Sequence, residues 1–291
     1  MLQTVDLLKL SEKERAVVFL NIYHIMILHG NLVLGAPKSW YNWPAFFNGV
    51  SYIINLECIT IAELEHCILR AASSAPSPKL SKFVVPSIRF PSLALKKRDF
   101  RINFCLNCGS GSMPSLVPIY NVKYLDEQFD EMTKVALRDS LKVDDANKVI
   151  FLPTICLWYW QDFVPPSTAG PAISLASSLE HCVNTLATYV QGETKVVLRR
   201  LLQSNLEKSV NGSCTNSADG GNDQEESVDE TGDFVSRFGN FDIKYCQFHY
   251  QCKNFAEFKD LSYISSPVEP HLSVHDSRTG RSLSKSKQDD N

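Results

Sequence analysis

The sequence predicts an α+β fold, with a single helix-dominated domain, a small sheet, a disordered acidic insert and a disordered C-terminal tail. Three observations lead to this prediction. Pairs of Ser or Thr with Glu three residues later mark helix starts ahead of long apolar runs. Short β-rich runs at about 50–56, 100–107, 148–152 and 241–247 predict four strands of one sheet. After the last predicted helix, the composition changes abruptly to Gly, Ser, Asn, Asp and Glu.

The first predicted helix begins at a capping box formed by Ser11 and Glu14. It is apolar on nearly all sides, which is typical of a buried central helix. Gly30 and Asn31 are its expected stop signals. A second capping box at Thr60 opens a short amphipathic helix that ends near residue 70.

Two further helices are predicted, over 124–141 and about 175–206. We expect the ordered domain to cover residues 1–258. Within it, residues 209–236 have few large apolar side chains and are too polar to bury enough surface to fold, so they are predicted to be disordered. The polar tail at 259–291 is predicted to be disordered too.

Composition excludes some classes of function. The formal net charge of -3 over 291 residues carries no basic footprint for nucleic acid. The most apolar run, 16–28, is too short for a transmembrane helix and is interrupted by Asn21 and His24. The nine cysteines are odd in number and lie mostly in apolar segments, which favours reduced thiols in the cytoplasm or nucleus.

Polar residues that interrupt apolar helices are the first candidates for a binding site. Asn21 and His24 are three residues apart and therefore share a helix face. Buried polar groups need partners, so these two must meet other polar groups. One reading places them in a cleft, and the other makes them a structural network that fixes helix packing. The predicted binding residues are Asn21, His24, Glu65, Arg70 and Arg101.

Cys108 is the candidate nucleophile, because a strand is predicted to deliver it to the glycine- and serine-rich turn that follows. A catalytic thiol needs a base to form thiolate, and His29 or His66 would be that base. Backbone N–H groups of 109–111 would stabilise an oxyanion. The alternative reading is a buried structural thiol.

A further alternative is a structural zinc site. Cys105 and Cys108 have the spacing of a zinc knuckle, and Cys246, His249 and Cys252 offer further ligands. A continuous strand would, however, point Cys105 and Cys108 to opposite faces. We therefore expect no metal and no cofactor.

Four segments together resemble the family known as domain of unknown function 547. The first is a helix resembling that family's Phe-Trp-Ile-Asn-Ile-Tyr-Asn motif, and the second is close to its Leu-Asp-Asp-Ile-Glu-His-Gly-Ile-Leu-Arg motif. The third matches Asp-x-Arg-x-His-Phe-Ala-Leu-x-Cys-Gly followed by Ser-Cys-Pro. The segments are Val18–His24 with His29, Ile61–Arg70, Asp99–Pro114, and Leu152-Pro153 with Trp158, Asp162 and Phe163.

This chain departs from the pattern at positions that bear chemistry. The family's His in the third motif is Asn103 here, its second Cys is Met113, and its Asn after Tyr23 is His24. The departures at Asn103 and Met113 favour a non-catalytic interaction or adaptor module that binds other proteins. The alternative is a thiol-dependent hydrolase or transferase that uses Cys108 with His29 or His66.

Overall fold

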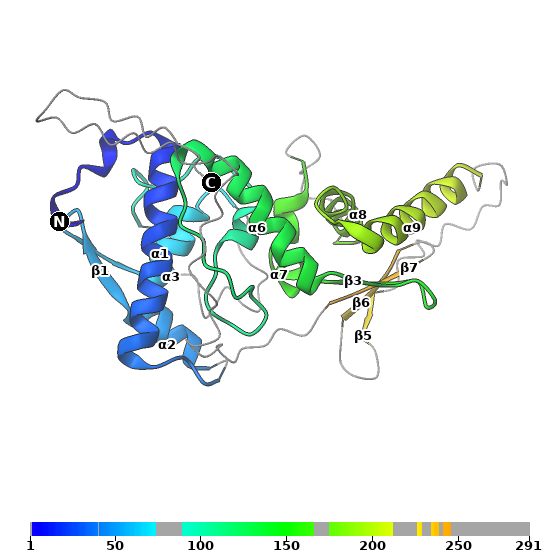
Figure 1. Cartoon of the computed structure of the whole chain (residues 1–291), viewed down its shortest axis with the longest axis horizontal. Coiled ribbons are helices and arrows are strands. Elements are labelled where there is room, and N and C mark those ends of the chain that lie inside the picture. Colours follow the sequence, from blue (N-terminus) through cyan, green and yellow to red (C-terminus); the bar gives the residue numbers. More distant parts are fainter. Residues whose placement is uncertain are drawn as a thin grey trace, which may run out of the picture.

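The computed structural model of the chain has a helix-dominated α+β architecture, which confirms the predicted fold class (Figure 1). Helix α1 with the β1–β2 hairpin lies at one end of the long axis, and α9 with the larger sheet lies at the other. The structure describes residues 2–39, 41–73, 89–165, 175–211, 226–228, 234–238 and 241–245.

Helix α1 (Glu12–Leu34) is the central helix of the N-terminal half. Its predicted capping box is confirmed, because the Ser11 Oγ accepts from the Glu14 N–H and the Glu14 carboxylate accepts from the Ser11 N–H. The predicted stop at Gly30 and Asn31 is wrong. The helix continues to Gly35, whose φ of 80° suits glycine at a helix end.

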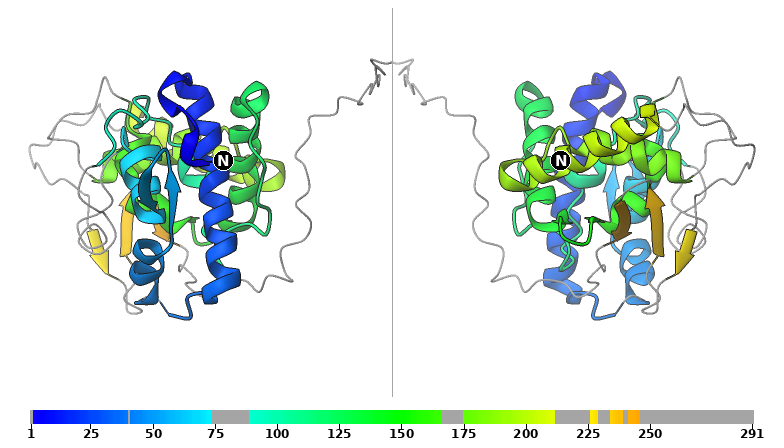
Figure 2. Two further views of the ribbon diagram at one scale, coloured as in Figure 1. Left: turned by 90° about the vertical axis from the view of Figure 1, so that its left-hand side faces the viewer. Right: turned by 90° about the vertical axis from the view of Figure 1, so that its right-hand side faces the viewer.

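By length and composition, α1 could cross a membrane, and half of its most apolar stretch is buried inside the fold. Phe19, Leu20 and Met26 are completely buried against neighbouring elements. The helix runs the height of the molecule in both views of Figure 2. It is thus the helix around which the N-terminal elements pack.

Short elements surround α1. Two 3₁₀ turns, η1 (Leu2–Thr4) and η2 (Leu7–Lys9), precede it, and α2 (Asn42–Gly49) follows it. Strands β1 (Ser51–Ile54) and β2 (Glu57–Thr60) then form an antiparallel hairpin. The two residues between them, Asn55 and Leu56, have positive φ, as a tight hairpin turn requires. The predicted strand over 50–56 therefore ends early, and it forms a separate sheet of two strands.

The second capping box is also confirmed at α3 (Ile61–Glu63), where the Thr60 Oγ1 accepts from the Glu63 N–H. The helix continues as a π-helical turn, η3 (Leu64–Leu69). Such turns are rare and are frequently found at functional sites. This one carries Glu65 and His66, and Arg70 follows it.

The predicted strand over 100–107 is wrong, because the segment forms a short helix, α5 (Ile102–Cys105). Residues 102–107 are all buried, so the alternation of apolar residues does not reflect one face toward solvent and one toward the core. Ile102 packs into one hydrophobic cluster, while Phe104 packs into another. The apparent period of two reflects burial on several sides.

The C-terminal half contains helices and one larger sheet. After η4 (Val122–Tyr124), α6 (Leu125–Ser140) confirms the helix predicted over 124–141. Two short helical segments follow the next hairpin. The helix predicted over 175–206 is two helices, because the first ends at Leu186 and the second begins at Gly192, where φ is 66°. The elements are α7 (Thr154–Trp158), η5 (Trp160–Phe163), α8 (Leu175–Leu186) and α9 (Gly192–Asn211).

The larger sheet has the order β3-β4-β7-β6-β5. Strand β4 pairs parallel with β7, and the other pairs are antiparallel. The strands near 148–152 and 241–247 thus belong to one sheet, as predicted, while the other two predicted strands do not join them. The strands are β3 (Lys142–Asp144), β4 (Val149–Leu152), β5 (Glu226–Val228), β6 (Phe234–Phe238) and β7 (Phe241–Tyr245).

Strands β5 and the start of β6 fall inside the predicted insert at 209–236. The rest of the insert beyond the end of α9, and the whole tail at 259–291, lie outside the described residues.

The buried apolar side chains of the described residues form two hydrophobic clusters. The first contains α1, α2, the hairpin, α3 and η3, and it extends to Phe129 and Met132 of α6. The second contains α7, α8 and α9, and it begins at Ala136 and Leu137 of the same helix. Helix α6 therefore contributes side chains to both clusters. Phe104 belongs to the second cluster, although other residues of its helix, α5, belong to the first.

Candidate functional site

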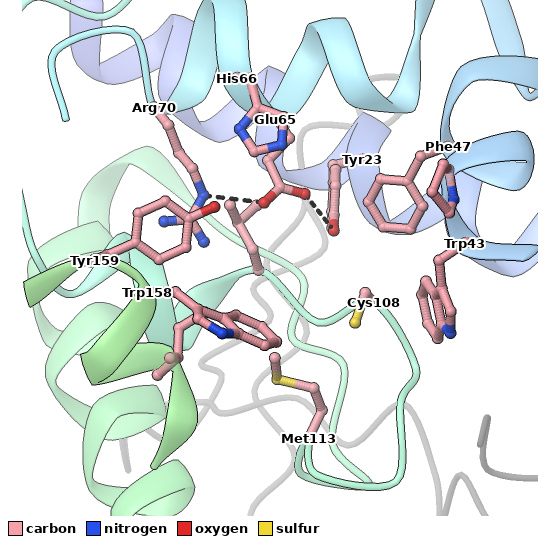
Figure 3. Close-up of a pocket in the computed structure, with 13 residues that line it drawn as sticks. Tyr23, Trp43, Phe47, Glu65, His66, Arg70, Cys108, Met113, Trp158 and Tyr159 are labelled. Atoms are coloured by element: carbon pink, nitrogen blue, oxygen red, sulfur yellow. Dashed lines mark hydrogen bonds and ion pairs between the residues drawn. The ribbon is translucent and has the colours of Figure 1, made fainter. Parts of the chain in front are cut away.

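A small pocket lies where these two clusters meet, and its volume is about 110 Å³ (Figure 3). Its wall combines five aromatic rings with a carboxylate, a guanidinium, an imidazole and a thiol. The aromatic residues are Tyr23 from α1, Trp43 and Phe47 from α2, Trp158 from α7 and Tyr159. The other lining residues are Pro44, Glu65, His66, Arg70, Leu106, Cys108, Met113 and Ile155.

Glu65 is the centre of the polar part of the wall. Its Oε2 accepts a hydrogen bond of 3.0 Å from the Tyr23 hydroxyl, and its Oε1 accepts one of 3.0 Å from Arg70 Nε. Figure 3 shows the carboxylate between these two partners. The exposed side-chain fractions are 11% for Glu65 and 4% for Arg70, so the ion pair is buried. Burial first, and then the Glu65 charge, raise the pKa of Tyr23 well above its usual value, so Tyr23 is a donor at neutral pH.

Arg70 continues the network away from Glu65. Its Nη1 donates to Asn103 Oδ1, and Asn103 Nδ2 donates to Asp162 Oδ2 at 3.2 Å. The guanidinium lies over the ring of Tyr159, 4.1 Å from the centroid. Burial disfavours the charged form, but Tyr159, Glu65 and Asp162 together still raise the pKa of Arg70. Segments far apart in the sequence are thus joined by one permanently charged side chain.

His66 lines the same pocket, with its Nε2 buried and lacking a hydrogen-bond partner among the described residues. Burial is the main cause that lowers its pKa, and Arg70 adds to the effect while Glu65 opposes it. At neutral pH the imidazole is therefore uncharged.

Cys108 is half-buried in the pocket wall, on the loop that also carries Met113 (Figure 3). The loop is held by Asn107, whose side-chain amide donates to the carbonyls of Pro114 and Leu116 at 2.8 and 3.0 Å. The Asn107 Oδ1 accepts from Gly109 N–H at 2.9 Å, where the chain turns with a φ of 82°. The position of the thiol is thus fixed by hydrogen bonds of its own loop.

His24 does not line the pocket. It contacts the loop that carries Cys108 instead. Its Nε2 accepts a hydrogen bond of 3.2 Å from the Asn107 backbone N–H, and its ring stacks on Tyr120. Burial lowers the pKa of His24 to about 4. The role of this neutral imidazole is to position the loop.

Three other predicted site residues lie elsewhere. Asn21 exchanges two hydrogen bonds with the backbone of Tyr120, at 2.8 and 3.0 Å, which is the structural reading of this residue. His29 is exposed, and its Nδ1 lies 2.6 Å from the Tyr52 hydroxyl. Arg101 forms ion pairs with Asp99, Asp126 and Asp130. Of the predicted set, Glu65, His66, Arg70 and Cys108 meet in one pocket.

The zinc ligands predicted as an alternative are not brought together in the described part of the chain. Cys105 is completely buried on α5, and burial raises the pKa of its thiol to about 12. Residues Cys246, His249 and Cys252 lie outside the described residues. Among those described, no group of three or more His, Cys, Asp or Glu residues could hold a metal ion.

Sequence reasoning missed several residues of the site. Asn103 was noted for its departure from the family pattern, but its bonds to Arg70 and Asp162 were not predicted. The aromatic rings were missed too, because each belongs to a segment that reads as ordinary core. The Trp158–Tyr159 pair after β4 is the signal that could have suggested an aromatic wall.

The fold and the site define a helix-dominated α+β protein with an aromatic-lined pocket between two hydrophobic clusters. The family model described as "Protein of unknown function, DUF547" matches residues 7–135, and this part of the chain belongs to that family. The match contains the first three motifs and ends within α6, before Trp158 and Asp162. No curated protein and no solved structure matches the chain.

Proposed function

We propose that the pocket receives one side-chain-sized group of a partner protein, which makes this chain a non-catalytic interaction module. The observation that carries the proposal is the pocket itself, which is small, mostly apolar and lined by five aromatic rings. Pockets for drug-sized ligands are roughly 300–1,000 Å³. A volume of about 110 Å³ suits a single side chain, and buried aromatic anchors are typical of interaction hot spots.

The polar groups of the wall support binding over catalysis. Both Glu65 oxygens accept hydrogen bonds from the protein, and Asn103 bridges Arg70 and Asp162 through an amide that cannot exchange a proton at neutral pH. The buried position of His66 disfavours the imidazolium that a thiolate partner would form.

One observation favours the alternative, a thiol-dependent hydrolase or transferase. Cys108 and His66 line the same pocket, and His66 Nε2 is a buried acceptor or donor with no partner in the part of the chain that the structure describes. In that reading, the neutral imidazole of His66 would take the proton of the Cys108 thiol. His29, the other candidate base, is exposed and bonds to Tyr52.

Alkylation of Cys108 by iodoacetamide, followed residue by residue by mass spectrometry, tests both functions. The exposed Cys58 on β2 is the internal reference. We expect Cys108 to react more slowly than Cys58 and its rate to fall continuously below pH 8, as for an ordinary thiol. A fast rate that persists to pH 6, and that is lost in His66→Ala, would establish the thiolate pair instead.

Occupancy of the pocket is tested in the same assay. A panel of N-acetyl amino-acid amides, neutral and cationic and including trimethyllysine, is added at millimolar concentration. We expect at least one of them to slow the alkylation of Cys108 saturably while Cys58 reacts unchanged. If no member of the panel protects Cys108 selectively, the pocket is not a side-chain receptor.

A further inference from the structure

We infer that the group bound in this pocket is a quaternary ammonium. The inference rests on the proposed function and specifies its ligand class. Five aromatic rings line the cavity. The face of an aromatic ring is electronegative and attracts cations, and aromatic-walled sites are the usual receptors of quaternary ammonium groups. This wall already holds one cation, because the Arg70 guanidinium lies 4.1 Å from the Tyr159 centroid.

The formal charges of the pocket wall do not oppose a cationic guest. Glu65 and Arg70 line the pocket as a buried ion pair, with 8% and 5% of their residue surfaces exposed, so together they add no net charge. Burial lowers the pKa of His66, so this imidazole adds no positive charge at neutral pH. The attraction of the aromatic rings for a cation is therefore not offset by a net positive charge in the wall.

The hydrogen-bonding capacity of the wall selects among cations. A primary ammonium carries three N–H donors that need acceptors when water is removed. The two Glu65 oxygens already accept from Tyr23 and Arg70, most of the wall is apolar, and His66 Nε2 would add a single acceptor, which is fewer than three N–H donors need. A quaternary ammonium has no N–H donor, so it loses no hydrogen bonds on entering. Its methyl groups contact the rings while its charge remains attractive to them.

Two sources carry this group, a trimethyllysine side chain of a partner protein and a free choline-type molecule. The probes are therefore choline, N-acetyl-trimethyllysine amide, N-acetyl-lysine amide and 3,3-dimethyl-1-butanol, which is the neutral carbon analogue of choline. Dissociation constants are measured on the full chain by saturation-transfer NMR, which does not depend on the reactivity of any cysteine. We expect choline and trimethyllysine amide to bind at least 10-fold more tightly than the neutral analogue and the lysine amide.

Two variants test the role of the wall. Trp158→Leu keeps an apolar side chain but removes a ring from the pocket, and we expect it to weaken choline about 10-fold. Trp160→Leu is the matched control, because Trp160 is two residues away and does not line the pocket. It should leave the affinity unchanged. Circular dichroism melts show whether each variant is folded. If Trp158→Leu does not fold, Trp158→Phe replaces it, because it puts a smaller aromatic ring at the same position.

The outcomes separate this inference from the proposed function. If 3,3-dimethyl-1-butanol binds as tightly as choline, the pocket is a receptor for an apolar group and the quaternary ammonium inference is overturned. Preference for lysine amide over trimethyllysine amide overturns it as well. If trimethyllysine amide binds more tightly than choline, the side chain of a partner protein is the source, and the reverse order indicates a free small molecule. Binding by no probe, neutral or charged, contradicts both the inference and the receptor function.

Discussion

At the scale of residues, the pocket depends on an ion pair that is costly to break. Removing one member of a buried pair leaves an uncompensated buried charge, which costs about 3–5 kcal/mol, whereas replacing both members is often nearly neutral. We expect Glu65→Leu to lower the free energy of unfolding by this amount, because Arg70 keeps its charge. The double variant Glu65→Leu/Arg70→Met should be more stable than Glu65→Leu alone. Urea denaturation measures both.

The control for these variants is the exposed ion pair between Lys9 and Asp6, with side-chain exposures of 83% and 51%. Lys9→Met should leave the urea midpoint unchanged, because exposed pairs contribute little. If Glu65→Leu proves as mild as Lys9→Met, the ion pair does not hold the pocket together.

His24 gives the protein a predictable loss of stability in acid. Its folded-state pKa of about 4 lies below the value near 6.5 of an unfolded chain. Between these pH values the unfolded chain binds a proton that the folded protein does not, so stability falls as the pH is lowered from 6.5 to 4. At 1.36 kcal/mol per pKa unit, the loss approaches about 3 kcal/mol. Above pH 6.5 the residue makes no pH-dependent contribution.

The measurement is the free energy of unfolding in urea at pH 7.0 and 4.5, for the wild type and for His24→Gln. The glutamine oxygen can still accept from the Asn107 N–H, but the side chain does not titrate. We expect a smaller acid loss in the variant. Some loss will persist, because burial also lowers the pKa of His66. Equal losses in both proteins would show that His24 is not the titrating group.

The residues of the site differ in how visible they are in the sequence. Glu65 and Arg70 stand out because charges interrupt an apolar helix, and they do line the pocket. Asn21 and His24 stand out for the same reason, yet they bind backbone groups. A polar residue in an apolar run signals only that it has a partner. Which partner it has depends on segments about 80 to 100 residues away, and no local pattern specifies those.

At the scale of elements, Gly30 sets how closely α2 approaches α1. A Cβ at this position would lie 2.8 Å from Phe46 Cζ and 3.0 Å from Val50 Cγ2. Phe46 is buried, so its ring cannot swing into solvent. Overpacking of this kind costs about 1–3 kcal/mol, against a gain of up to about 1 kcal/mol in helix propensity. We expect Gly30→Ala to destabilise the protein by about 1–2 kcal/mol.

Gly49→Ala is the matched control, because Gly49 also lies in a helix and a Cβ there would meet nothing within 4 Å. Its melting temperature should equal or exceed that of the wild type. Pocket binding by Gly30→Ala is a second readout, since Trp43, Pro44 and Phe47 of α2 would be displaced with Phe46. A stable Gly30→Ala variant would mean that α2 moves away from α1 at little cost.

Elements whose boundaries depend on local chemistry were predictable. The capping boxes at Ser11 and Thr60 are formed by side chains three residues apart, and both helix starts are where the sequence places them. The end of α1 was predicted too early, because Gly30 allows close packing inside the helix. A glycine with this role cannot be distinguished in the sequence from one that ends a helix. Helix α5 was predicted as a strand because apolar residues alternate in its sequence. Residues 102–107 are all buried, so this alternation does not separate a buried face from an exposed one.

At the scale of the whole molecule, the pocket exists because the two hydrophobic clusters meet without filling the space between them. Tyr23 and Phe47 belong to the first cluster, and Ile155, Trp158 and Tyr159 belong to or pack against the second. The family match ends within α6, the helix that both clusters share. The sequence predicted one domain with one sheet, since nothing in a chain's local pattern tells which apolar residues pack with which.

The Arg70–Tyr159 contact is expected to couple the two clusters in unfolding. Arg70 follows η3 of the first cluster, and Tyr159 belongs to the second. A desolvated cation–π contact contributes roughly 0.5–2 kcal/mol. In the wild type, we expect the amides of α1 and α8 to exchange hydrogen with the same opening free energy, because both clusters share α6. In Tyr159→Leu, the α8 amides should open about 1–2 kcal/mol below those of α1.

Native-state hydrogen exchange followed by mass spectrometry measures both free energies in one experiment. Tyr41→Leu is the control, because Tyr41 is 64% exposed and its loss should leave the two helices matched. If α8 already opens well below α1 in the wild type, the clusters are independent units. The pocket between them would then open whenever the second cluster does, and a bound side chain would stabilise α8 more than α1. If the two helices stay matched in Tyr159→Leu, the shared helix α6 alone carries the coupling.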